Sequence, residues 1–296
     1  MKLLTYRISG STQIGVLSAT GDAVVPLHAV IDIPESASMI DFIASHTEEQ
    51  FAKIREASAL SSGLAISLEE VQILSPIERP IHDVMCVGVN YAAHREESKG
   101  TKNDFDASQM QRSIYFGKRA SHIAGPDEPV VCRSDIDVEM DYEVELAVII
   151  GKHCKDVKTE EAEDVIFGYS VFNDFSSRKL QREHVQWLKG KSMDGYTAMG
   201  PVILTKDELP FPLAVDVISL VNGEERQHSN TCMLLNDVAG IISDLSEGMT
   251  LEPGDIIATG TPAGVAMGMA EPKWLKAGDT VICRIPQIGD LRNPIV

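Results

Sequence analysis

The stretch DYEVELAVIIGK, residues 141–152, places two acidic side chains in a segment whose apolar residues predict a buried β-strand. Side chains alternate along a strand, so Glu143 and Glu145 share one face, with Cα atoms roughly 7 Å apart. Two buried carboxylates repel each other, and a hard divalent cation bound by both is the simplest way to neutralise them. The alternative is an edge strand with one wet face, on which the pair is merely solvated.

The overall charge limits the classes of partner. Lys and Arg number 26 against 44 Asp and Glu, which gives a net charge of −18 and argues against nucleic acid or an anionic membrane as the principal partner. The five cysteines are widely spaced and include no C-x-x-C pair, which predicts reduced thiols and a cytoplasmic protein. No apolar run has the length of a membrane span, and the start has no signal-peptide core.

Two units are predicted along the 296 residues. Residues 1–75 combine short apolar runs separated by turn residues with one helix-like stretch, 36–59, and therefore predict a small α/β module. Pro76 and Pro80 mark the boundary. Residues 76–296 are predicted to form the second, larger unit.

A third acid is predicted to lie beside the first two. The strand VIFGYSVFND ends at Asp174, just before a helix expected over 176–190. Together with Glu143 and Glu145, Asp174 would supply enough oxygen ligands for Mg²⁺ or Mn²⁺ while leaving positions open for substrate and water. The all-oxygen set argues against structural zinc. The alternative is that Asp174 only caps the helix.

A candidate general base lies in the motif NYAAHREE. His94 and Glu97 are three residues apart, so on a helix they share a face and can touch, and a carboxylate that orients a histidine is typical of a base that activates water. The alternative is a surface His–Glu pair with no catalytic role. The charged segment 95–113 contains few large apolar residues and could be a mobile lid or an ordinary surface loop.

Further polar groups are expected near the same strand ends. Lys191 could place a positive charge beside an oxyanion, and Arg178 and Gln181 lie on the first turns of the helix that follows Asp174. In GTPAGV, 260–265, glycines flank a Thr-Pro turn whose backbone N–H groups could hold a carboxylate. No phosphate-loop or nucleophile-elbow motif occurs.

The ordered set of motifs resembles the fumarylacetoacetate hydrolase family. The resemblance covers nearly everything from Pro76 to the C-terminus and implies an α+β fold, a mixed β-sandwich roll with short helices, usually in a homodimer. The matching motifs are CVGVNYAAHREE, DYEVELAVIIGK, FGYSVFNDFSSRKLQ, GKSMDGYTAMGP, VNGEERQ and MTLEPGDIIATGTPAGV.

The resemblance also implies a role for individual residues. It makes the three acids ligands of Mg²⁺ or Mn²⁺, puts a His–Glu dyad on a closing lid, and lines the pocket with groups that face a bound 2-oxo acid. By these matches the metal ligands are Glu143, Glu145 and Asp174, the catalytic residues are His94, Glu97 and Lys191, and the substrate-binding residues are Arg178, Gln181, Thr261 and, near the mouth of the pocket, Lys118.

The predicted function is metal-dependent cleavage of a carbon–carbon bond in a small 2-oxo acid. The reaction is either hydrolysis of an acylpyruvate or decarboxylation of oxaloacetate, each through a metal-bound pyruvate enolate. One alternative is an isomerase or hydratase acting on a hydroxymuconate-type dienoate, and another is a catalytically silent 2-oxo acid-binding protein. Ser177, Lys179 and Met193 depart from residues common in the family without touching the metal ligands or the dyad, so the substrate stays open.

Overall fold

The strand that carries the acids lies inside the main sheet. In the computed structural model, which describes residues 1–59, 63–99, 101 and 112–296, β9 (Val144–Ile150) is hydrogen-bonded to β10 (Ile166–Asp174) and to β15 (Ile256–Ala258). Every residue of β9 is buried, and its two faces enter two different apolar clusters. The predicted strand is therefore confirmed, and the alternative of an edge strand with one wet face is wrong. Most of the lid predicted over 95–113 lies outside the described residues.

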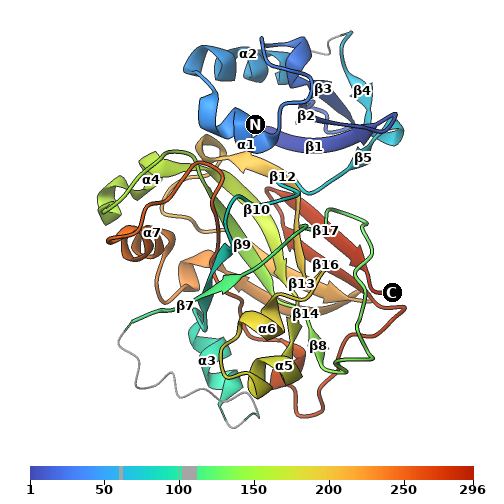
Figure 1. Ribbon diagram of the computed structural model, residues 1–296, viewed down its shortest axis with the longest axis vertical. Helices are drawn as coiled ribbons and strands as arrows, with labels where there is room; N and C mark the ends of the chain where they lie inside the picture. The colour runs from blue at the N-terminus through green and yellow to red at the C-terminus, as the bar shows by residue number, and fades with distance from the viewer. Residues whose placement is uncertain (60–62, 100, 102–111) are drawn as a thin grey trace.

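The main sheet has 11 strands in the described chain, and the N-terminal strands lie at its upper end in Figure 1. Its order is β4-β3-β2-β1-β12-β10-β9-β15-β6-β7, with β5 beside β1, and the pairing is antiparallel except between β15 and β6. The remaining strands of this sheet are β1 (Lys2–Ile8), β2 (Ser11–Leu17), β3 (Ala23–Pro26), β4 (Ile66–Ser67), β5 (Gln72–Ile73), β6 (Val84–Gly88), β7 (Ile114–Lys118) and β12 (Thr197–Thr205).

A second, four-stranded sheet packs against the first. Its order is β14-β13-β16-β17, and apolar residues from both sheets, such as Val217, Cys283 and Leu146, belong to one buried cluster. This arrangement, with short helices around it, confirms the predicted α+β fold. The strands of the second sheet are β13 (Asp216–Val221), β14 (Glu224–Asn230), β16 (Thr280–Ile285) and β17 (Gly289–Pro294), and β8 (Met140–Asp141) pairs separately with β11 (Ser176–Ser177).

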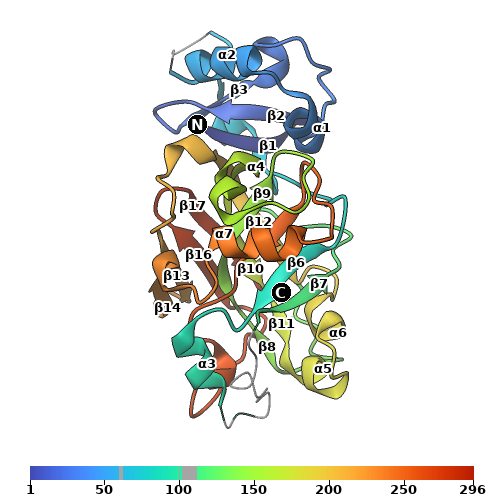
Figure 2. The same ribbon diagram turned by 90° about the vertical axis from the view of Figure 1, so that its left-hand side faces the viewer.

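The N-terminal strands join the main sheet directly, because β1 pairs with β12. Over them lie α1 (Met39–Ser45) and α2 (Glu48–Ala59), where a single helix had been expected (Figure 2). The helix breaks because Thr47 starts a second one: its side chain accepts from the N–H of Gln50, whose side chain accepts from the N–H of Thr47. The domain boundary after residue 75 stays a prediction.

Short helices carry the residues of the candidate site. These are α3 (Ala92–Ser98), α5 (Arg178–Glu183) and α6 (Leu188–Lys191), while α7 (Val238–Ser246) covers the main sheet further along. The helix expected over 176–190 is thus two helices, and Val185 between them has a left-handed backbone with φ 59°. None of the described helices is long and apolar enough to cross a membrane.

Packing around β9 makes a stability prediction. Leu146 is fully buried between the sheets, so Leu146→Ala leaves a cavity and should lower the free energy of unfolding by about 2–5 kcal/mol. Chemical denaturation measures this change. Leu64→Ala is the matched control, because Leu64 is 49% exposed and should lose well under ~1 kcal/mol. Equal losses at both positions would contradict the placement of β9.

Candidate active site

Three buried carboxylates converge where β9 and β10 lie side by side. Glu143 precedes β9, Glu145 lies on it, and Asp174 ends β10, whose N–H at this residue donates to the carbonyl of Glu143 at 3.0 Å. One ligand atom from each acid lies within 4.8 Å of the other two. The set is the one expected from sequence. Carboxylate oxygens at this spacing, without thiol or imidazole, suit Mg²⁺ or Mn²⁺.

Three cations lie against these acids. The Nζ of Lys191 is 2.7 Å from Glu143 Oε2 and 2.8 Å from Asp174 Oδ2. The Nη2 of Arg178 is 2.6 Å from Glu143 Oε1, and the Nζ of Lys118 is 2.6 Å from Asp174 Oδ1. Glu143 and Asp174 are therefore each held by two cations, because buried charges of one sign require charges of the other.

Glu145 makes no ion pair within the described chain. Its Oε2 accepts one hydrogen bond, from the N–H of Gly260 at 2.8 Å. Burial and the neighbouring charges of Asp174 and Glu143 raise the pKa of Glu145 well above its ordinary value. Burial acts in the same direction on Glu143, but Lys191 and Arg178 outweigh it and lower the pKa of Glu143 to about 2. The pKa values of the two acids are therefore shifted in opposite directions, and Glu145 is the one that would have to lose a proton when a cation binds.

Lys118 lies behind the acids and not at the mouth of the pocket, where it had been expected. Its side chain is fully buried, and its Nζ donates to the carbonyl of Phe175 at 2.9 Å and to the carbonyl of Lys191, besides pairing with Asp174. The two carbonyls accept hydrogen bonds from Nζ, and Asp174 adds an ion pair. From this position Lys118 can orient Asp174 and α6, and a ligand in the cavity meets Lys191 instead.

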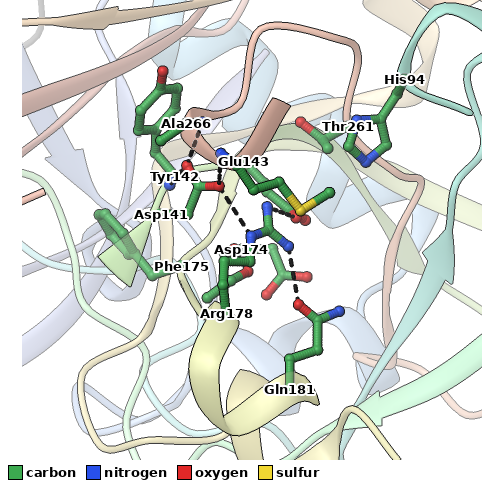
Figure 3. Close-up of polar contacts among 12 residues, drawn as sticks. His94, Asp141, Tyr142, Glu143, Asp174, Phe175, Arg178, Gln181, Thr261 and Ala266 are labelled. Carbon is green, nitrogen blue, oxygen red and sulfur yellow. Dashed lines mark hydrogen bonds and ion pairs between the residues drawn. The ribbon is translucent and has the colours of Figure 1, made fainter. Parts of the chain in front are cut away.

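Arg178 is held in place by a residue that the sequence analysis had not singled out. Its Nε donates to Asp141 Oδ2 at 2.9 Å and its Nη1 to Gln181 Oε1 at 3.1 Å, so the guanidinium lies between these two side chains (Figure 3). Asp141 is fully buried. It also accepts from the backbone N–H of Ala266 at 2.8 Å and of Met267 at 3.1 Å. In the sequence, the only indication of this role was that Asp141 is the first residue of the DYEVE motif.

The segment 260–267 holds carboxylates of the chain itself. Besides the N–H groups on Asp141, the N–H of Gly260 donates to Glu145 and that of Gly264 donates to Glu97 Oε1 at 2.9 Å. Gly264 has φ 109°, and a Cβ there would lie 1.9 Å from the carbonyl oxygen of Arg226, so only glycine fits. The prediction that this turn offers N–H groups to a carboxylate is met by acids of the protein.

Thr261 is fixed by the second sheet. Its hydroxyl donates to the carbonyl of Val144 at 2.9 Å and accepts from Gln227 Nε2 at 2.7 Å. Gln227 lies on β14 and is the last residue of the motif VNGEERQ, but it was not predicted from the sequence to be part of the site. Its Oε1 accepts from the N–H of Val144 at 3.0 Å. One buried glutamine therefore ties the turn to the strand that bears the acids.

The His–Glu pair forms as expected on α3. His94 Nδ1 is 3.1 Å from Glu97 Oε2, and the imidazole is 4% exposed. If Nδ1 carries the proton for this bond, Nε2 is an acceptor, which is the form a general base needs. His94 points toward the other side chains of the site (Figure 3). Glu97 is thus held both by the histidine and by the N–H of Gly264.

A small cavity of about 30 Å³ joins most of these groups. Asp174, Glu97 and Lys118 are not among its lining residues and lie behind those that are. Part of its wall is aromatic, formed by Phe116 and Trp187, whose rings meet edge to face at 5.1 Å. The predicted site residues that line the cavity are His94, Glu143, Glu145, Arg178, Gln181, Lys191 and Thr261.

The raised pKa of Glu145 makes a prediction about stability. Between pH ~4.5 and the raised pKa, the folded protein keeps a proton that the unfolded chain has lost, so this residue makes the free energy of unfolding fall as pH rises. Glu145→Gln removes that slope. In chelator the variant should be more stable than wild type toward pH ~8, as denaturation curves across pH would show. Exposed Glu247→Gln is the control, and parallel curves for wild type and Glu145→Gln would contradict the assignment.

Comparison with known proteins agrees with this geometry. Residues 83–296 match the family model described as fumarylacetoacetate (FAA) hydrolase C-terminal. The structure of a fumarylacetoacetate hydrolase from Exiguobacterium antarcticum is similar, with 38% sequence identity and a TM-score of 0.84. A maleylpyruvate hydrolase from Sphingobium sp. SYK-6, solved with manganese(II) and pyruvate, has 31% identity and a TM-score of 0.79. A 5-carboxymethyl-2-hydroxymuconate delta-isomerase from Mycobacterium smegmatis has 30% identity and a TM-score of 0.77. Each match covers 100% of this chain and 99% of the other. The chain belongs to the fumarylacetoacetate hydrolase family.

Proposed function

We propose that the protein cleaves a carbon–carbon bond of a small 2-oxo acid with the help of Mg²⁺ or Mn²⁺. The observation that carries the proposal is one cavity that exposes two acids of a three-carboxylate cluster beside His94. When bound by Glu143, Glu145 and Asp174, the metal would supply Lewis-acid polarisation of the 2-oxo group. The maleylpyruvate hydrolase relative, solved with manganese(II) and pyruvate, supports this choice of metal and ligand class.

His94 is proposed as the general base. Nε2 would take a proton from water that attacks the carbonyl beyond C3 of an acylpyruvate, while Glu97 on Nδ1 holds the ring and stabilises the imidazolium. Glu97 does not line the cavity, so it acts through His94. In decarboxylation no water attacks. Loss of CO₂ leaves an enolate, and His94 in its imidazolium form would give its Nε2 proton to the enolate carbon.

Lys191 is proposed to stabilise the negative oxygen that develops during cleavage. Loss of the acyl group, or of CO₂, leaves a pyruvate enolate in both reactions, and an ammonium in a water-poor site stabilises such an oxygen strongly. Lys191 lines the cavity, is 2% exposed, and keeps its charge because Asp174 and Glu143 raise its pKa against the opposing effect of burial. The aromatic wall at Phe116 and Trp187 would receive the departing group.

An isomerase is the second candidate. The Mycobacterium smegmatis relative is named a 5-carboxymethyl-2-hydroxymuconate delta-isomerase, and the same base and cation could move a proton along a dienol without water. A dienoate is longer than acetylpyruvate or oxaloacetate. The cavity of about 30 Å³ has room for only about one or two water molecules, so its volume does not choose between a dienoate and the shorter 2-oxo acids.

The substrate assignment is tested by a parallel assay. Protein stripped with chelator and reloaded with Mg²⁺ or Mn²⁺ should release pyruvate from acetylpyruvate, from oxaloacetate, or from both, and Glu143→Gln should abolish this because a metal ligand is lost. Turnover of oxaloacetate alone names a decarboxylase, and turnover of acetylpyruvate alone names a hydrolase. Isomerisation of a hydroxymuconate-type dienoate without pyruvate release would replace the proposal with the second candidate.

The dyad is tested by a matched pair of variants on one helix. Glu97→Gln can still accept from the N–H of Gly264 but loses the charge that supports His94, so kcat should fall by about 10²–10⁴-fold. Metal affinity should change by less than about twofold, because Glu97 is not a ligand. Glu96→Gln is the control, since Glu96 is 69% exposed and its partner is Lys99. Unchanged kcat in Glu97→Gln would contradict the dyad.

A further inference from the structure

A second cavity, of about 430 Å³, adjoins the turn that begins α3. Gly88 and Val89 line both cavities, so the two share one stretch of backbone. The second cavity continues along the start of β7 and the segment before α7. It is lined by Gly88, Val89, Asn90, Arg95, Arg112, Ser113, Ile114, Leu235, Asn236 and Asp244.

Two arginines of this cavity have no acidic partner in the described chain. Among residues 1–59, 63–99, 101 and 112–296, no carboxylate forms an ion pair with Arg95 or Arg112. The net charge is −18, and Arg55, Arg178 and Arg284 are paired with acids. Arg79 and Arg119 have no ion pair in the described chain either, but both are exposed, whereas Arg95 is partly buried. The protein as a whole is negatively charged, so a cavity with two unpaired guanidinium groups differs from the rest of the molecule in the sign of its charge.

Arg95 is the more constrained of the two. It is partly buried, and its Nε is sealed from solvent without a hydrogen-bond partner. A buried donor that is left unpaired costs free energy, roughly 1–3 kcal/mol. A guanidinium presents several N–H groups in one plane and suits a planar or tetrahedral oxyanion. Arg112, at an exposed position, adds a second positive charge.

The one carboxylate among the lining residues is engaged elsewhere. Asp244 Oδ2 accepts from the hydroxyl of Tyr115 at 3.0 Å and from Asn236 Nδ2 at 3.2 Å. The side chain of Asn90 is also occupied, because it donates to the carbonyls of Asn236 and Thr259, both at 2.9 Å. These bonds hold the walls in place. Their donors are neutral, so Asp244 keeps its charge, and the two arginines outweigh it among the described lining residues.

We propose that this cavity is a second binding site, distinct from the three-carboxylate centre, for a small oxyanion such as a carboxylate or inorganic phosphate. The anion accepts hydrogen bonds from Arg95 and is attracted by Arg112. Arg95 follows His94 on α3, and Asn90 ties the preceding turn to Thr259 beside the acid-holding segment 260–267. An anion bound here therefore steadies the helix that carries the dyad.

The test uses full-length protein in chelator, so that it does not depend on the proposed reaction. Inorganic phosphate and succinate are titrated separately by calorimetry at low chloride. Saturable binding of either is expected, and the preferred anion tells phosphate from carboxylate as the source. Arg95→Gln should weaken binding at least roughly 10-fold, because a charge-assisted hydrogen bond is lost. Arg112→Gln should weaken it less.

A matched control separates this site from general charge effects. Arg79 is exposed and makes no ion pair in the described chain, so Arg79→Gln removes the same charge at another place and should bind the anion as wild type does. The melting temperature of Arg95→Gln without anion should be no lower than that of wild type, because the buried Nε has no hydrogen-bond partner to lose. No saturable binding, wild-type affinity in Arg95→Gln, or equal loss in Arg79→Gln would overturn the proposal.

Discussion

The site depends on how the charges of Glu143, Glu145 and Asp174 are neutralised without water. Lys191, Arg178 and Lys118 each pair with Glu143 or Asp174, and no cation of the described chain pairs with Glu145. Arg178 is also shared with a fourth buried acid, Asp141, so the acids outnumber the cations. A buried carboxylate without a cation binds a proton instead. Ion pairs therefore neutralise Glu143 and Asp174, and Glu145 is the acid that can gain a cation as a partner. Occupation by a metal requires Glu145 to lose its proton and Lys191 to give up contacts to oxygens that the metal needs.

One short segment connects the acids to the proposed base. Between residues 260 and 267, backbone N–H groups donate to Glu145, Glu97 and Asp141, and Asp141 in turn holds Arg178. The N–H groups are fixed by the chain path and do not change protonation. The three carboxylates and the His–Glu pair are thus linked through hydrogen bonds to one backbone segment. A change in this segment should therefore disturb both halves of the site together.

The sequence was sufficient to predict those site residues whose side chains are unusual for the element that carries them. Two acids in a buried strand, a third at the end of the next strand, and a His–Glu pair at helical spacing predicted the cluster and the contact on α3, and the family motifs predicted the fold. The predicted position of Lys118 at the mouth of the pocket was wrong, because the spacing of residues in the sequence does not tell which face of β7 other elements cover. Asp141 and Gln227 were missed because their roles are hydrogen bonds to distant backbone groups. Helix breaks at Thr47 and Val185 depended on a local cap and a left-handed residue.

The central claim is that Glu143, Glu145 and Asp174 together bind one divalent ion. The most direct measurement is a crystal structure of protein loaded with Mn²⁺, with anomalous scattering used to locate the metal. The account predicts a single strong peak among the three carboxylates at about 2.0–2.3 Å from an oxygen of each, with Lys191 Nζ moved off at least one of them. A cluster still bridged by Lys191, with manganese absent or bound elsewhere, would contradict it.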